Sequence, residues 1–514
     1  MTRTRTQYAL LNIWSNTAGY FLNTLLGFVC RIVFVRCLTA EHLGISGLFT
    51  NLIMMLSLSE LGLGAVMTHA LYKPIAQKNE AKVKALMQYF AKVYKIIFVI
   101  FIVIGISIIP YLNFFIKDPP NINESFEQIY LLFLFTTAIT YLFAHQSLFL
   151  MASQRQYIVT TVNYTVTIIQ SCLQIFFLFQ TKNYIHYLII QVLGSVLQFF
   201  LIAYIVRKDT DHHTVEKYNL TKVDKSQIFR NVWQLSLGRI SGFLVNGTDN
   251  IIIAKFIGVV SVGILSNYVL LIKTVENFIL SLMGSISAGI GNFNAVSDKL
   301  STSKLFNNIC FIAFVCYGWI SLAFFICSND LILLLFGENY VMNNTICALL
   351  CLNFFMSGLI NLVGTFMNSL GVFTKGRLVV IFTAIFNVVL SVLFGLSWGI
   401  SGVLAATAVA RLVTNWWYQP RVLFKYGFDK KPTTYFLNYS YFLIIIITSI
   451  LIGTFLSSVI QFEFNLIHTL SKLLISSLVF FLCVYLIYRK NDEFKYMYDK
   501  TKQILESLIA RKVS

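Results

Sequence analysis

The chain has 514 residues, of which 57% are hydrophobic and only 12% are charged. An ordinary globular domain carries about 25% charged residues, so this composition excludes a normal water-facing surface. The net charge of +18 at pH 7 does not indicate nucleic acid, because Lys and Arg lie in alternate loops between apolar segments and not along one basic face.

Apolar segments of about 20 residues, each long enough to cross about 30 Å of hydrocarbon, recur from end to end. The stretch after Arg3 and Arg5 is too long for a signal peptide and lacks a small-residue cleavage site, so we interpret it as a retained first helix. In chain order the segments predict fourteen transmembrane helices, at 9–35, 43–70, 93–116, 128–151, 157–180, 184–206, 232–256, 262–288, 305–328, 343–370, 376–397, 401–424, 435–460 and 466–488.

The loops that follow even-numbered helices carry most of the positive charge. Examples are Lys73, Lys78, Lys82 and Lys84 after the second helix. Since cytoplasmic loops are enriched in Lys and Arg, both termini are expected to face the cytoplasm.

The longest interior loop divides the first six helices from the next six, and an internal repeat supports this division. Residues 31–38, followed by Gly44, align without gaps with residues 250–257, followed by Gly263. The sequence therefore predicts an all-α polytopic membrane protein with about 14 transmembrane helices, built as two six-helix bundles with a pseudo-twofold repeat plus two C-terminal helices. Its expected parts are an N-terminal six-helix bundle (1–206), a cytoplasmic linker (207–231), a C-terminal six-helix bundle (232–424), helices 13 and 14 (425–488) and a cytoplasmic amphipathic tail (489–514).

The motifs of the common soluble and membrane enzymes are absent from the sequence. It has no GxxxxGK[ST], no GxGxxG after a strand and no HExxH. The two longest outer loops, 117–128 and 329–342, offer no paired carboxylates for acid and base catalysis. The nine cysteines lie in apolar runs without metal-ligand spacing. We therefore expect a transporter, with no catalytic residue, cofactor or metal.

Ionisable residues at membrane depth are the remaining candidates for function, because each costs about 3 kcal/mol at the bilayer centre on an insertion scale. Arg31, Arg239 and Lys273 would give a shared cleft an excess of positive charge, and arginine can hold phosphate oxygens in pairs. We therefore predict that these three bind an anionic substrate. Asp249 and Glu276 are the carboxylates expected nearest to them and are predicted to couple an ion.

The sequence also allows other interpretations of these ionisable residues. Lys273 and Glu276 are one turn apart on one helix face, so they could simply neutralise each other. Glu60 and Arg411 are interpreted as anchors near the membrane interface, and His145 as a hydrogen-bonded packing residue.

Over nearly its whole length the chain resembles the Wzx-type O-antigen and capsule flippases, the polysaccharide repeat-unit flippases of the multidrug/oligosaccharidyl-lipid/polysaccharide exporter superfamily. The stretches that carry the resemblance are packing and turn signatures, which identify a fold better than a substrate. They are residues 36–44 with 47–49, Ser59-Glu-Leu-Gly-Leu-Gly64, Thr248-Asp-Asn-Ile-Ile-Ile253, residues 258–268, Gly291-Asn-Phe-Asn294 and Trp398-Gly-Ile-Ser-Gly402.

The resemblance implies translocation of undecaprenyl-diphosphate-linked oligosaccharide from the cytoplasmic to the outer leaflet of a bacterial inner membrane, driven by a proton or sodium gradient. It also implies a polymerase and glycosyltransferases as pathway partners, with membrane lipid as the surroundings. The alternatives are a lipid II flippase or a drug/cation antiporter of the same superfamily and, from another class, a membrane oligosaccharide polymerase. A eukaryotic relative is a further alternative, because Asn123 and Asn343 begin glycosylation sequons.

Overall fold

The computed structural model describes residues 5–57, 62–117, 120–210, 220–221, 225–232, 236, 247–372, 375, 377–459 and 465–513. Contacts within the chain divide it into two compact units, residues 1–266 and 267–514. All regular elements among the described residues are helical. This confirms the predicted all-α polytopic fold class.

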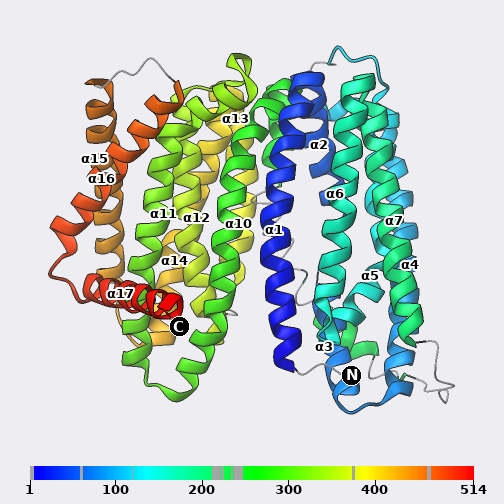
Figure 1. Cartoon of the computed structure of the whole chain (residues 1–514), viewed down its shortest axis with the longest axis horizontal. Helices are drawn as coiled ribbons and strands as arrows, with labels where there is room; N and C mark the ends of the chain where they lie inside the picture. Colours follow the sequence, from blue (N-terminus) through cyan, green and yellow to red (C-terminus); the bar gives the residue numbers. More distant parts are fainter. Residues whose placement is uncertain are drawn as a thin grey trace. The chain divides into compact units, whose positions relative to one another are not determined.

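In the first unit α1 packs against α6, α6 against α7 and α7 against α5 (Figure 1). Its elements are α1 (Arg5–Cys37), α2 (Ala40–Leu56), α3 (Leu63–Ala76), α4 (Glu80–Ile108), η2 (Ile109–Phe115), α5 (Phe126–Ala152), α6 (Gln156–Thr181), α7 (Tyr184–Thr210) and α9 (Asp249–Phe256). Helix α10 (Val259–Val296) begins in this unit and continues into the second.

The second unit holds the remaining helices and a large aromatic core. Its elements are α11 (Lys299–Phe336), η3 (Glu338–Tyr340), α12 (Asn344–Ser369), α13 (Arg377–Val413), α14 (Asn415–Val422), η5 (Leu423–Phe428), α15 (Thr433–Val459), α16 (Asn465–Tyr488) and α17 (Asp492–Val513). Phe314 stacks on Phe442 with ring centroids 3.6 Å apart, which joins α11 to α15. Helix α17 runs across the other helices of its unit (Figure 1) and packs Phe494 and Met497 against the same core.

Eleven segments of the described residues are long and apolar enough to cross a membrane, against fourteen predicted. The predicted second helix is interrupted, because α2 ends at Leu56 and α3 begins only after Gly62, whose φ is 95°. Most of the predicted seventh helix, 232–256, lies outside the described residues. The predicted eleventh and twelfth helices fall within one apolar stretch, Val379–Phe428. The number fourteen therefore stays a prediction.

That stretch contains a sharp reversal of the chain inside α13. Gly399 has φ 61° and ψ −140°, a conformation open mainly to glycine. On either side of it, the Asn387 side-chain amide donates to the Thr407 hydroxyl over 2.8 Å. The Thr383 and Thr414 hydroxyls lie 2.6 Å apart. These pairs show that α13 is an antiparallel helical hairpin, with its turn where the sequence places a short loop between helices 11 and 12.

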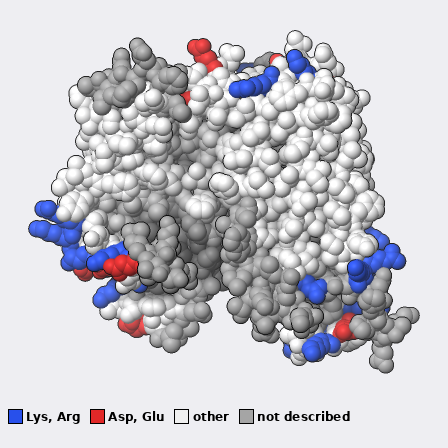
Figure 2. Space-filling model, in the orientation of Figure 1, with Lys and Arg blue, Asp and Glu red and all other residues white. Residues whose placement is uncertain are grey.

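On the face in view, the charged side chains of the described residues lie near the helix ends. Figure 2 shows Lys, Arg, Asp and Glu near the two ends of the helices and an uncharged band between them. Aliphatic side chains on the apolar helices, such as Ile104 on α4 and Leu478 on α16, are 44% and 63% exposed. An apolar band of this kind is stable in contact with lipid chains and not in contact with water.

Candidate functional site

The predicted site residues divide between the two units. Arg31 and Asp249 belong to the first unit, whereas Lys273 and Glu276 belong to the second. Arg239 lies outside the described residues. A single cleft that contains all five residues therefore stays a prediction, and each residue is described within its own unit.

Arg31 lies on α1 and turns its guanidinium toward the first turns of α10. There it donates to the hydroxyl of Ser266, which in turn donates to the Gly263 carbonyl oxygen over 2.6 Å. Arg31 is half-buried. Ser266 thus holds the guanidinium of Arg31 against the start of α10.

The start of α10 approaches α2 so closely that glycines are required on both helices. A Cβ at Gly44 would collide with the carbonyl oxygen of Val259, and a Cβ at Gly263 would collide with that of Ala40. Small residues permit such backbone contact between membrane helices. The tight crossing places Ser266 within reach of Arg31.

Lys273 and Glu276 form an ion pair on α10, 2.6 Å from Nζ to Oε2. The side chain of Glu276 is only 8% exposed, whereas that of Lys273 is 52% exposed. The other oxygen of Glu276 accepts a hydrogen bond from the Ser357 hydroxyl of α12 over 3.3 Å. The geometry is therefore compatible with mutual neutralisation of the pair and also with substrate binding by Lys273 and ion coupling by Glu276. A buried carboxylate holds an ammonium group that is itself half-exposed.

Asp249 is the first residue of α9, at the helix end where a carboxylate is stabilised by the helix dipole. The other end of α9 is joined to η2. The Lys117 backbone amide donates to the Ala254 carbonyl oxygen over 3.2 Å, and the Lys255 ammonium lies 3.8 Å from the centre of the Phe114 ring. Asp249 thus lies on a short helix that is fixed to the first bundle at its far end.

Arg411 on α13 is buried, which differs from the expected anchor at the membrane interface. Its guanidinium donates to the backbone carbonyl and the side-chain oxygen of Asn353 on α12, over 2.9 and 3.2 Å. The Asn353 amide donates in turn to the Leu404 carbonyl over 2.9 Å. Arg411 therefore ties α12 to the helical hairpin. Glu60, the other expected anchor, lies outside the described residues.

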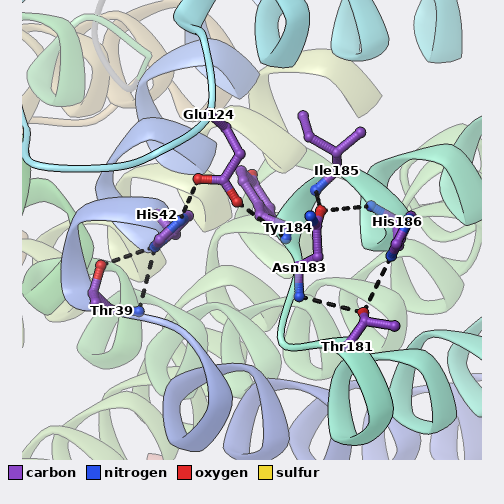
Figure 3. A network of polar contacts seen from close by, with 8 residues as sticks. All are labelled: Thr39, His42, Glu124, Thr181, Asn183, Tyr184, Ile185 and His186. Atoms are coloured by element: carbon purple, nitrogen blue, oxygen red, sulfur yellow. Dashed lines mark hydrogen bonds and ion pairs between the residues drawn. The ribbon is translucent and has the colours of Figure 1, made fainter.

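A polar network that the sequence analysis missed joins three loops at one end of the first unit (Figure 3). Nε2 of His42 lies 3.2 Å from Oε2 of Glu124, while Nδ1 lies 2.8 Å from the Thr39 hydroxyl. The second oxygen of Glu124 accepts from the backbone amide of Tyr184 over 3.4 Å. Glu124 thereby connects the starts of α2 and α7. No short-range sequence pattern indicates this contact, because His42 and Glu124 are 82 positions apart in the sequence.

The described residues contain no group of three or more His, Cys, Asp or Glu side chains that could hold a metal ion. In the same part of the chain all nine cysteines are free thiols. Cys30, Cys310, Cys327, Cys347 and Cys351 are buried.

A family model described as "Polysaccharide biosynthesis protein" matches residues 9–288. No curated protein sequence matches the chain significantly.

Solved structures of transporters have a similar fold. The structure of the lipid II flippase MurJ in an inward closed conformation superposes with a TM-score of 0.67 at 16% identity, covering 94% of this chain and 99% of that one. An inward-facing multidrug resistance transporter of the MATE family, in the MOP superfamily, gives 0.55 at 14% identity, covering 78% and 94%. The MATE transporter VcmN of Vibrio cholerae gives 0.54 at 14% identity, covering 82% and 97%.

Proposed function

Because the chain belongs to the polysaccharide biosynthesis protein family, we propose that it is a flippase for lipid-linked oligosaccharides. It translocates undecaprenyl-diphosphate-linked repeat units from the cytoplasmic to the outer leaflet during O-antigen, capsule or exopolysaccharide synthesis. The likeness to flippase and transporter structures supports this function through the fold alone.

The observation that carries the proposal is the presence of cationic side chains at membrane depth. Arg31 donates to the Ser266 hydroxyl, and Lys273 keeps half of its side chain exposed beside its carboxylate. Since such groups cost about 3 kcal/mol each at the bilayer centre, a functional reason is expected. A diphosphate offers several oxygens to these donors, and Arg239 is proposed as the third cation of the same site.

Ion coupling follows from the Lys273–Glu276 pair. A proton or sodium ion that neutralises Glu276 would release the Lys273 ammonium for the diphosphate. Binding of the ion and binding of the substrate would then be thermodynamically linked through this pair. Asp249 is proposed as a second carboxylate in this step. Alternating access of the two repeats would carry the head group across, while the lipid tail stays in the bilayer.

The proposed function also implies a membrane location and partner enzymes for this protein. The chain is a multi-pass membrane protein, and we place it in the bacterial cytoplasmic membrane with both termini in the cytoplasm. Glycosyltransferases would assemble the lipid-linked unit on the cytoplasmic side, and a polymerase would consume it on the other side.

The test is export of surface polysaccharide in cells that depend on this chain. Arg31→Ala, Arg239→Ala and Lys273→Ala should each lower export, and the triple variant should abolish it, at unchanged amounts of protein in the membrane. Lys304→Ala, at an exposed lysine at the beginning of α11, is the matched control and should export normally. Normal export by the triple variant would overturn the proposed substrate site.

A lipid II flippase is the second candidate, favoured by the match that covers 99% of the MurJ structure. Lipid II also carries a diphosphate, so the same cations would bind it. Rescue of cells depleted of their own lipid II flippase would establish this alternative. Failure of rescue combined with polysaccharide export would exclude it.

A further inference from the structure

The second unit contains a small polar pocket away from α10. It lies where α11 and α15 begin and where α16 passes into α17, and it has a volume of about 20 Å³. This is room for one group the size of a water molecule. Asn307, Asn438, Tyr488 and Glu493 contribute polar groups to its lining, and Phe311 and Phe442 contribute aromatic rings.

One of these polar groups is buried without a partner, and another is a carboxylate without a cation. Tyr488 is 5% exposed, and its hydroxyl has no hydrogen-bond partner among the described residues. Glu493 is half-buried and takes part in no ion pair within the same part of the chain. The buried hydroxyl is costly without a partner and the carboxylate carries negative charge, so the pocket is suited to a ligand that supplies hydrogen-bond donors and positive charge.

A primary ammonium group has these properties. It offers three N–H donors in the space of one water molecule. Its charge would neutralise Glu493, and the Tyr488 oxygen and the amide oxygens of Asn307 and Asn438 are further acceptors. The rings of Phe311 and Phe442 favour a cation beside them. A trimethylammonium group has no N–H donor and is larger than the pocket.

The surroundings indicate where the ammonium comes from. Arg489 and Lys490, both exposed, follow Tyr488 directly and offer positive charge to a phosphate beside the pocket. Leu437, Tyr441 and Ile444 lie on one face of α15, with exposed fractions of 58%, 55% and 54%. An anion-binding pair next to a cation pocket, beside an exposed apolar helix face, matches a phospholipid whose head group carries both charges.

We propose that this pocket binds the ethanolamine head group of a phosphatidylethanolamine-type phospholipid, with its ammonium on Glu493 and Tyr488. The phosphate lies against Arg489 and Lys490, and the acyl chains lie along α15. The bound lipid thereby joins α11, α15 and the junction between α16 and α17. This inference is independent of the cargo that the protein moves.

The full chain in lipid nanodiscs provides the test, with lipid retention measured by native mass spectrometry and stability by thermal unfolding. Dioleoyl-phosphatidylethanolamine should be retained and should raise Tm relative to the phosphatidylcholine and phosphatidylglycerol analogues. Stepwise N-methylation of the ethanolamine should remove the effect progressively, because each methyl group replaces a donor and adds volume.

Variants separate the pocket from general lipid effects. Glu493→Gln should lower phosphatidylethanolamine retention about tenfold, as loss of a charge-assisted contact implies. Tyr488→Phe should weaken it less, and it serves as the second variant if Glu493→Gln does not fold. Asp499→Asn, at an exposed residue of α17, is the matched control and should behave like the wild type.

Three results would overturn the proposal. They are equal retention of phosphatidylcholine, a preference for phosphatidylglycerol, and an unchanged ethanolamine preference in both pocket variants. The last result would leave only a water molecule in the pocket. Export of polysaccharide is not used as a readout, so failure of this test is distinct from failure of the proposed flippase function.

Discussion

Gly44 and Gly263 make the same contact in opposite directions. Gly44 lies against the Val259 carbonyl at the start of α10, and Gly263 lies against the Ala40 carbonyl at the start of α2. The two glycines occupy corresponding positions of the internal repeat, and so do Ala40 and Val259. A reciprocal contact of this kind is the geometry that a twofold-related repeat predicts.

Gly44→Ala should destabilise the protein by roughly 1–3 kcal/mol, because the new methyl group would collide with the Val259 carbonyl. Unlike a side chain, this backbone group cannot move aside by changing its rotamer. Thermal unfolding in detergent measures this effect. Gly27→Ala on α1 is the matched control, since a Cβ there has no neighbour within 4 Å. Equal stability of the Gly44 and Gly27 variants would contradict the crossing.

Lys117 and Ala254 are joined through their backbones, so cysteines at both positions should form a disulfide, whose Cα atoms need to be about 4.4–6.8 Å apart. Because the sequence predicts that α9 belongs to the second repeat, opening of this end would require the contact to break. Oxidation of the double-cysteine variant should block polysaccharide export, and reduction should restore it. Single-cysteine variants serve as controls. Continued export with the crosslink complete would rule out alternating access by separation at this contact.

Glu276→Gln imitates the neutral carboxylate and leaves the Lys273 ammonium without its charged partner. Export should then become insensitive to the gradient that drives the wild type, although substrate is still bound. Export measured while the proton or sodium gradient is collapsed selectively tests this expectation. Glu338→Gln, at an exposed residue of η3, should keep wild-type coupling. Unaltered gradient dependence in Glu276→Gln would remove this carboxylate from the coupling step.

Glu124→Gln should lower stability by about 1–3 kcal/mol, because the buried His42 ring and the Tyr184 amide lose a charged acceptor. The neighbouring Glu127 is exposed, and Glu127→Gln should have almost no effect. Chemical or thermal unfolding compares the two variants. Equal stability of both would mean that the network in Figure 3 adds nothing to the fold.

Reporter fusions at residues 210–225 and after Arg489 should both show a cytoplasmic location. The Lys and Arg residues near these points keep the two segments on the cytoplasmic side of the membrane. Paired alkaline phosphatase and fluorescent protein fusions give opposite signals on the two sides. An external signal at either point would require a different number of spans.

The sequence predicted the fold class well because lipid exposure leaves a strong record in composition. The helix bounds were predicted less well where hydrophobicity is not the determinant. Helix α4 begins at Glu80 and not near residue 93, since its first turns are amphipathic and carry Lys84 and Lys92. A hydropathy window detects only the apolar part of such a helix. The break before α3 depends on the backbone conformation of Gly62, which a window over residues 43–70 averages away.

Side-chain partners were predictable only over short distances. The Lys273–Glu276 pair follows from helical spacing alone. The partner of Arg411 is Asn353, 58 positions earlier, and the choice between an interface anchor and a buried cation depended on that amide. The same applies to Ser266, which meets Arg31 only because Gly44 and Gly263 let α10 approach α2.

The hairpin within α13 also constrains how the protein is made. Its reversal at Gly399 leaves no hydrophilic stretch between the two spans, and the buried amide of Asn387 has the Thr407 hydroxyl of the second span as its acceptor. If the first span entered the bilayer alone, that amide would face hydrocarbon, which costs several kcal/mol for an unsatisfied polar group. The two spans therefore have to leave the translocation machinery as a pair, and a ribosome that stalls between them would strand an insertion intermediate with an exposed amide.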